Sequence, residues 1–158
     1  NKNYINIFFP EAMHMKEFHG SLIGHVAAST VIYTKLHNYH WFVKGPNFFT
    51  LHEKFESLYT EAAGYIDEIA ERILTIGGKP VGTLKECLEL SSIKEAEGSE
   101  TADDMIRTLL EDFKTLNEEI NDIIEKAQEV NDEATSDLIL GIKSSLEQNI
   151  WMFNAYIG

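Results

Sequence analysis

The sequence is dominated by long stretches in which apolar residues recur at the three- and four-residue spacing of an α-helix. Its 158 residues include only three prolines, and turn-forming residues break the pattern at Gly45-Pro46, at Gly77-Gly78 and at Asn131-Asp132. This punctuation predicts four helices of roughly 25 residues each, which is the pattern of a four-helix bundle. The predicted fold class is therefore all-α.

The first helix is expected to begin at Pro10, because proline and the acidic Glu11 after it suit the first turn of a helix. It is expected to end near Val43. The chain would then form one domain over residues 1–158, with residues 1–9 as an N-terminal extension.

The second helix is expected to begin near Asn47, or at Thr50 with Glu53 as its capping-box partner, and to end near Ile76. A long crossover follows over residues 77–100. A connection of this length between the second and third helices predicts a four-helix bundle with one long crossover.

The crossover contains a short helical stretch, residues 84–90, for which Thr83 and Glu86 form a capping pair. Two further helices are expected over residues 101–130 and residues 132–156.

Composition restricts the function. The net charge of −13 should repel nucleic acid and membrane phosphates, and Lys2 is the single basic residue among the first ten. Cys87 is the only cysteine, which fits a reducing cytoplasm. No apolar run approaches the roughly 20 residues of a membrane span, and the first residues lack a secretory signal pattern. We therefore expect a cytoplasmic protein that binds neither nucleic acid nor membranes.

The second helix has three faces when its residues are placed about 100° apart. The first is an apolar stripe expected to face the core: Leu51, Phe55, Leu58, Ala62, Ile66, Ile69 and Ile73. The second is polar and expected to face water: Lys54, Ser57, Glu61, Glu68 and Arg72. The third mixes polar and apolar groups: His52, Glu56, Asp67 and Glu71 with Tyr59, Ala63, Ala70 and Leu74. This mixture predicts a subunit interface with polar sites embedded in it.

The polar groups of the third face form two pairs, His52 with Glu56 and Asp67 with Glu71, each spaced four residues apart. Imidazole nitrogen and carboxylate oxygen suit iron, manganese or zinc. The pairs are about 22 Å apart along the helix, so one ion cannot contact both. An antiparallel two-fold contact would join the first pair of one chain to the second pair of its partner. His40 would complete the ligand set, although each pair alone also fits a solvated helix face.

The segments around these residues resemble Dps-type mini-ferritins, the family named for DNA-binding proteins from starved cells. The resemblance covers residues 12–158 and is carried by N-Y-H-W-F-V-K-G-P-N-F-F-T-L-H-E-K-F-E, by D-E-I-A-E-R-I-L-T-I-G-G-K-P and by the ending I-W-M-F-N-A-Y-I-G. It implies a ferritin-like four-helix bundle with a short extra helix in the crossover between helices two and three. It also implies a hollow dodecamer built from two-fold dimers.

The resemblance further implies ferroxidase sites at the two-fold interfaces, each binding two iron ions. His40, His52 and Glu56 would come from one chain, and Asp67 and Glu71 from its partner. Zinc or manganese would suit the same ligands. Position 56 is often Asp in the family, and the longer Glu56 still supplies a carboxylate.

The implied reaction is the oxidation of Fe(II) to Fe(III), with hydrogen peroxide as the favoured oxidant and dioxygen as a slower one. The ferric mineral would be stored in the shell, which protects against oxidative damage. Trp41 resembles an aromatic residue near the site, with interface packing as the alternative. Asp132, Glu133 and Asp137 occupy the region of an acidic pore for iron, and favourable placement near a helix N-terminus is the alternative.

Three other functions are alternatives to ferroxidase activity in a dodecameric shell. A larger ferritin or bacterioferritin shell would have a di-iron site inside each bundle, which needs two E-x-x-H motifs, whereas only Glu11 and His14 form one. A DNA-compacting shell without strong ferroxidase activity conflicts with the acidic charge. A plain helical interaction protein would leave the acids solvated. No site is assigned to His14, His19 or His25.

Overall fold

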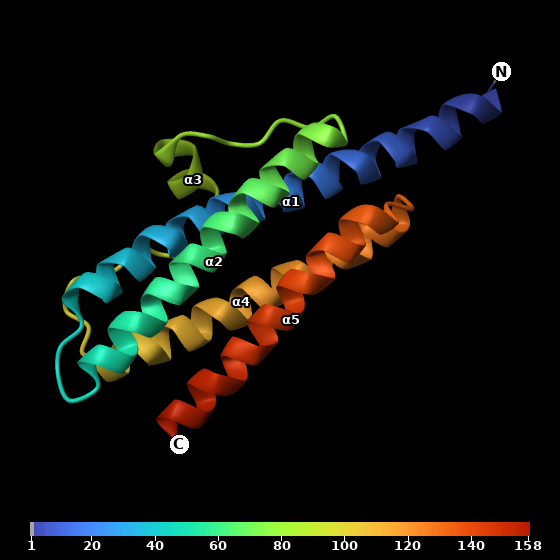
Figure 1. The fold of residues 1–158 in the computed structure, drawn as a ribbon. Helices are drawn as coiled ribbons and strands as arrows, with labels where there is room; N and C mark the ends of the chain where they lie inside the picture. Colours follow the sequence, from blue (N-terminus) through green and yellow to red (C-terminus); the bar gives the residue numbers. More distant parts are fainter. Residues whose placement is uncertain (1) are drawn as a thin grey trace.

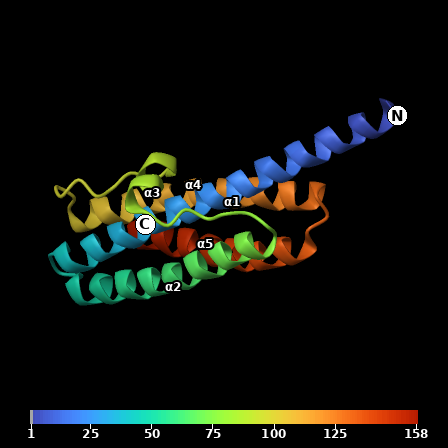
Figure 2. The same ribbon diagram turned by 90° about the horizontal axis from the view of Figure 1, so that it is seen from above.

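The computed structural model describes the backbone of residues 2–158 and the side chains from Glu11 onward. The elements are α1 (Lys2–Phe42), α2 (Phe48–Thr75), α3 (Leu84–Leu90), α4 (Ala102–Glu129) and α5 (Glu133–Ile157), with no strand among residues 2–158. The four long helices lie alongside one another as a bundle, and the short α3 packs against α1 in the crossover (Figures 1 and 2). The predicted all-α bundle with a short helix in its crossover is confirmed.

The start of α1 differs from the prediction. The helix begins at Lys2 rather than at Pro10, so the proline lies inside it and residues 2–9 continue α1. A proline inside a helix removes one backbone donor, and here the helical backbone continues on both sides of it. The N-terminal part of α1 extends beyond the end of the bundle (blue in Figure 1).

The turn between α1 and α2 sets the start of α2. Gly45 has a φ of 115°, a conformation that glycine adopts without a steric penalty. The Phe48 backbone N–H donates to the Gly45 carbonyl at 3.0 Å, and α2 begins at once. Asn47 is the N-cap, its side chain makes no capping hydrogen bond, and Thr50 lies inside the first turn. Of the two predicted starts of α2, the one near Asn47 is therefore confirmed, and the capping box of Thr50 and Glu53 is wrong because the N-cap lies three residues before Thr50.

The later helix starts agree with their sequence signals. The Thr83 hydroxyl accepts a hydrogen bond from the Glu86 backbone N–H at 3.2 Å. Thr101 and Asp104 form a reciprocal capping box at the start of α4. Asp132 caps α5. Side-chain caps of this kind satisfy backbone donors that the first turn leaves free.

The apolar stripe of α2 faces the core as predicted. Its buried residues are Leu51, Phe55, Leu58, Ile69 and Ile73, and Ala62 and Ile66 are half-buried. These side chains pack with buried apolar residues of α1, α4 and α5 in one core. Within residues 2–158, no helix is long and apolar enough to cross a membrane.

The stripe of α2 predicted to face water is partly wrong, because α5 covers two of its residues. The Glu61 carboxylate accepts hydrogen bonds from the Tyr65 and Ser145 hydroxyls. Arg72 donates to the Thr135 hydroxyl at 2.8 Å and to the Asp132 carboxylate at 3.0 Å. Both side chains therefore join α2 to α5.

Asp132 has two structural roles, as the cap of α5 and as the ion-pair partner of Arg72. Burial raises the pKa of this carboxyl, but the hydrogen bonds from Thr135 and Arg72 outweigh burial and hold the pKa below its ordinary value. A carboxyl with a lowered pKa stabilises the folded state above its ordinary pKa, and this contribution is lost as the pH falls through the folded-state pKa.

Replacing Asp132 with Ala is therefore expected to lower the free energy of unfolding by about 1–2 kcal/mol at neutral pH, the usual cost of losing a cap. Denaturant titrations of both proteins should show the difference shrinking toward acid pH. The exposed Asp137 offers a matched control, Asp137→Ala, with little effect expected. A difference that is the same at neutral and acid pH would contradict this account of the cap.

Candidate metal centre

Two histidines from different helices face each other where α1 ends and α2 begins. His40 lies in the last turn of α1 and His52 in the second turn of α2. Their rings stack with centroids 3.7 Å apart and planes 11° apart. His40 Nδ1 donates to the His52 carbonyl at 2.6 Å, and His52 Nδ1 donates to the His40 carbonyl at 2.7 Å. Because a carbonyl oxygen only accepts, both Nδ1 atoms carry the proton.

The two hydrogen bonds determine which nitrogen of each ring is without a proton. In a neutral imidazole with its proton on Nδ1, the lone pair that binds a metal is on Nε2. Neither Nε2 has a hydrogen-bond partner among the described residues. The His40 carbonyl belongs to the last turn of α1, where intrahelical donors run out. His52 therefore also satisfies a backbone group at the end of α1.

A carboxylate and a tyrosine lie beside the two histidines. Glu56 is exposed and follows His52 by one turn of α2. The Tyr59 hydroxyl lies 3.5 Å from Glu56 Oε1, and its ring meets the His40 ring edge-on with centroids 5.4 Å apart. Burial, and after it the negative charge of Glu56, raises the pKa of Tyr59. The hydroxyl thus keeps its proton and is the donor in this contact.

Aromatic rings border the histidine pair on the α1 side. His37 stacks on Tyr59 with centroids 3.8 Å apart, and Trp41 lies 5.2 Å from His37. Trp41 itself is 64% exposed, and Leu74 on the third face of α2 is 60% exposed. Both side chains are open to solvent on a single chain.

The second predicted ligand pair does not join the first within one chain. Asp67 and Glu71 are exposed on α2, and at the rise per residue of a helix Asp67, the nearer of the two, lies about 22 Å from His52. Among residues whose side chains are described, no group of three or more His, Cys, Asp or Glu is placed to hold a metal ion. A single chain thus presents the histidine pair with Glu56 at one end of this face and the acidic pair at the other.

The three acids predicted near a pore lie around the start of α5. Glu133 and Asp137 are exposed and line a surface hollow together with Asp132. The Asp132 carboxylate, however, is already engaged by Thr135 and Arg72. The helix-terminus role considered for these acids therefore holds for Asp132.

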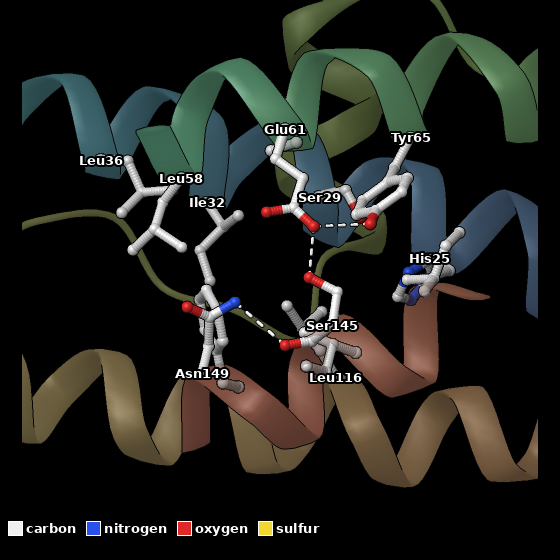
Figure 3. A pocket seen from close by; sticks show the side chains of 14 residues that line it. His25, Ser29, Ile32, Leu36, Leu58, Glu61, Tyr65, Leu116, Ser145 and Asn149 are labelled. Carbon is white, nitrogen blue, oxygen red and sulfur yellow. Dashed lines mark hydrogen bonds between the residues drawn. The ribbon is translucent and has the colours of Figure 1, made fainter. Parts of the chain in front are cut away.

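The interior of the bundle contains a small cavity of about 40 Å³ that is lined mostly by apolar side chains (Figure 3). The single carboxylate among its lining residues is Glu61, which accepts from Tyr65 at 2.5 Å and from Ser145. Burial, with the hydrogen bond to Glu61 next, raises the pKa of Tyr65 to about 12. A di-iron centre inside a bundle needs several carboxylates, so this cavity does not support the larger-ferritin alternative.

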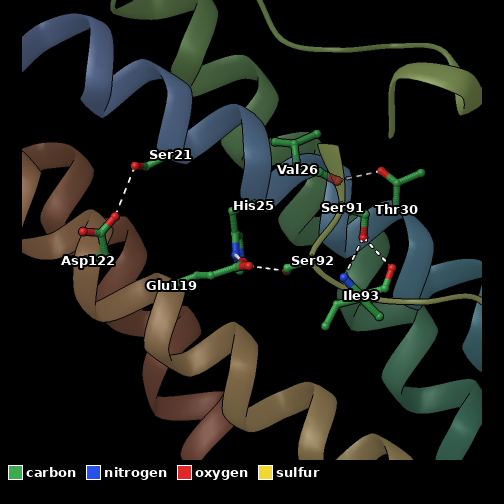
Figure 4. Close-up of polar contacts among 9 residues, drawn as sticks. All are labelled: Ser21, His25, Val26, Thr30, Ser91, Ser92, Ile93, Glu119 and Asp122. Carbon is green, nitrogen blue, oxygen red and sulfur yellow. Dashed lines mark hydrogen bonds and ion pairs between the residues drawn. The ribbon is translucent and has the colours of Figure 1, made fainter. Parts of the chain in front are cut away.

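The remaining histidines have structural surroundings or face solvent. His25 is buried, and its Nδ1 lies 3.4 Å from Glu119 Oε2 on α4 (Figure 4). The Ser92 hydroxyl donates to the other oxygen of Glu119, so the contact joins α1, α4 and the crossover. Glu11 and His14, which form the single E-x-x-H motif, are both exposed.

Comparison with known proteins shows the family of this chain. Residues 22–158 match the family described as ferritin-like domain. "DNA protection during starvation protein 2" of Bacillus anthracis is 58% identical over 132 residues, which are 84% of this chain and 90% of that protein. The chain belongs to the Dps family of ferritin-like proteins.

Two solved Dps structures extend the comparison. A Dps protein from Bacillus brevis is 48% identical, with a TM-score of 0.91 over 92% of this chain and 98% of that one. A Dps protein from Vibrio cholerae O1 is 34% identical, with a TM-score of 0.88 over 92% of each chain. The latter is described as a member of a broad superfamily of ferritin-like diiron-carboxylate proteins. The family resemblance seen in the sequence is thereby confirmed.

Two features of this centre were missed by sequence reasoning. The reciprocal histidine bonds depend on carbonyls of the opposite helix, which no sequence pattern marks. The contact of Tyr59 with Glu56 had a signal, because residues three apart on a helix are neighbours, but tyrosine was assigned only to the apolar part of that face.

The histidine tautomers can be tested directly. Neutron diffraction from metal-free crystals in deuterated buffer is expected to show deuterium on Nδ1 of His40 and His52, because each faces a carbonyl that only accepts. His37, whose Nδ1 has no hydrogen-bond partner, is the internal comparison. Deuterium on Nε2 with a bare Nδ1 at either ring would contradict the assignment.

Proposed function

We propose that this chain forms a hollow dodecamer that oxidises Fe(II) at sites shared between two chains and stores the ferric product as a mineral. The observation that carries the proposal is the stacked pair of His40 and His52, with both Nδ1 atoms engaged and both Nε2 atoms free. Membership of the Dps family and the exposed carboxylate of Glu56 support it.

The partner chain completes the ligand set in this proposal. An antiparallel two-fold contact between two α2 helices brings Asp67 and Glu71 of one chain to the histidines of the other, which forms two equal sites per dimer. Ala63 is exposed and Ala70 half-buried along the same face. Their small side chains allow close approach of the two helices, and Trp41 at the edge of the site then packs against the partner.

Iron is the substrate of the proposed reaction. Each of two Fe(II) ions loses one electron, and hydrogen peroxide takes both electrons with two protons to give two water molecules. Delivery of the two electrons together avoids the release of a hydroxyl radical. Carboxylate oxygens suit the ferric product, while the imidazole nitrogens hold Fe(II) beforehand. Dioxygen serves as the slower oxidant, and zinc or manganese competes for the same ligands.

The route of iron into the shell is a further part of the proposal. Glu133 and Asp137 are exposed around the hollow at the start of α5, where their carboxylates attract cations. Asp132 shapes the same region through its cap and its ion pair. A DNA-compacting role is less favoured, because the net charge of −13 opposes the neutralisation of phosphates on which DNA affinity depends.

The test is the double variant His52→Ala, Glu56→Ala. Its oxidation of Fe(II) by hydrogen peroxide is expected to fall to the rate of the reaction in buffer, because every site loses two of the three ligands that this chain supplies and keeps only His40. Absorbance of the ferric product gives the rate, and native mass spectrometry checks that the assembly is intact. The exposed Thr50 and Glu53 give a matched control, Thr50→Ala with Glu53→Ala, which should keep the parent rate. An Fe(II) oxidation rate equal to that of the parent in the first variant would contradict the site assignment.

A further inference from the structure

We infer that Tyr59 is a positioning residue that holds the Glu56 carboxylate in place for metal binding. The inference rests on the proposed function, since Glu56 is one of the proposed ligands. Tyr59 is the residue that contacts two members of this set at once, His40 through its ring edge and Glu56 through its hydroxyl.

The Tyr59 ring is fixed by its neighbours. His37 stacks on it with planes 18° apart, and Tyr33 meets it edge-on with centroids 6.1 Å apart. The edge-on contact with His40 completes a surround drawn from α1. Three aromatic contacts on one ring restrict its rotation, so the position of the hydroxyl above α2 is set by α1.

Glu56 is less restrained within the chain than the two histidines, His40 and His52. It is exposed, and an exposed glutamate has several rotatable bonds whose freedom metal binding must restrict. The two histidines, by contrast, are each held by a backbone carbonyl. The Tyr59 hydroxyl lies 3.5 Å from one carboxylate oxygen, which is longer than the roughly 2.5–3.0 Å of a usual O–H···O hydrogen bond. This contact leaves the second oxygen free for a metal ion.

Metal-binding carboxylates are commonly oriented by a hydrogen bond from a neighbouring residue, and removal of that partner weakens metal binding. The variant Tyr59→Phe removes the hydroxyl and keeps the ring. We expect its affinity for Co(II), a probe with a visible spectrum that reports on the ligands, to fall about tenfold. The Co(II) spectrum should change, and the mass of the assembly should not.

Tyr33→Phe is the matched control, because Tyr33 is also half-buried and packs on His37 but has no described contact with a proposed ligand. It should keep the parent affinity. The same Tyr59→Phe change is then made in a Glu56→Ala background, where it should leave the remaining affinity unchanged, since the group it positions is gone.

The outcomes distinguish failure of the positioning role of Tyr59 from failure of the proposed metal site. If the parent binds Co(II) in a way that His52→Ala abolishes, and Tyr59→Phe matches the parent, the positioning role is overturned and the proposed site stands. Equal losses in Tyr59→Phe and Tyr33→Phe, or a loss that persists without Glu56, would show general packing instead and overturn it too. If the parent binds no Co(II) that depends on His52, the proposed function itself fails.

Discussion

The rigidity of α2 governs the arrangement of the whole centre. A helix rises about 1.5 Å per residue, so the ligand pairs of α2 are held on one face at a separation that no single ion spans. Among the residues whose side chains the structure describes, His40 is the one further metal-binding group beside either pair in the same chain. Each ligand pair of α2 therefore needs the other pair from a second chain to complete a site. In the proposed dimer, a two-fold antiparallel contact would meet this need twice, and assembly would then be a condition of activity.

The turn between α1 and α2 connects folding to chemistry. His40 and His52 exchange hydrogen bonds with each other's backbone, and each such bond contributes about 0.5–1.5 kcal/mol net. The same bonds direct both ring protons to Nδ1 and leave Nε2 for a metal. Tyr59 contacts His40 of α1 through its ring and Glu56 through its hydroxyl, and so connects α1 to this carboxylate. A change that loosens this turn would thus affect stability and metal binding together.

The sequence predicted features that depend on local signals. The buried stripe of α2, the short helix of the crossover and the cap at Thr83 follow from spacing along one segment, and the structure has them. The start of α1 was not predictable from Pro10, since one proline does not force a helix to end. Glu61 and Arg72 were assigned to water because a helical wheel shows which residues share a face but not which helix lies opposite. The histidine tautomers depend on the same kind of contact between helices.

Subunit mixing tests whether each site takes its ligands from two chains. One variant lacks His52 and Glu56, the other lacks Asp67 and Glu71, and each alone should be inactive. Unfolded together in equal amounts and refolded, they form mixed dimers in which one of the two sites is complete. Random pairing under two-fold symmetry predicts about a quarter of the parent ferroxidase activity. A mixture that stays as inactive as its components, in assemblies of parent mass, would contradict a site shared between chains.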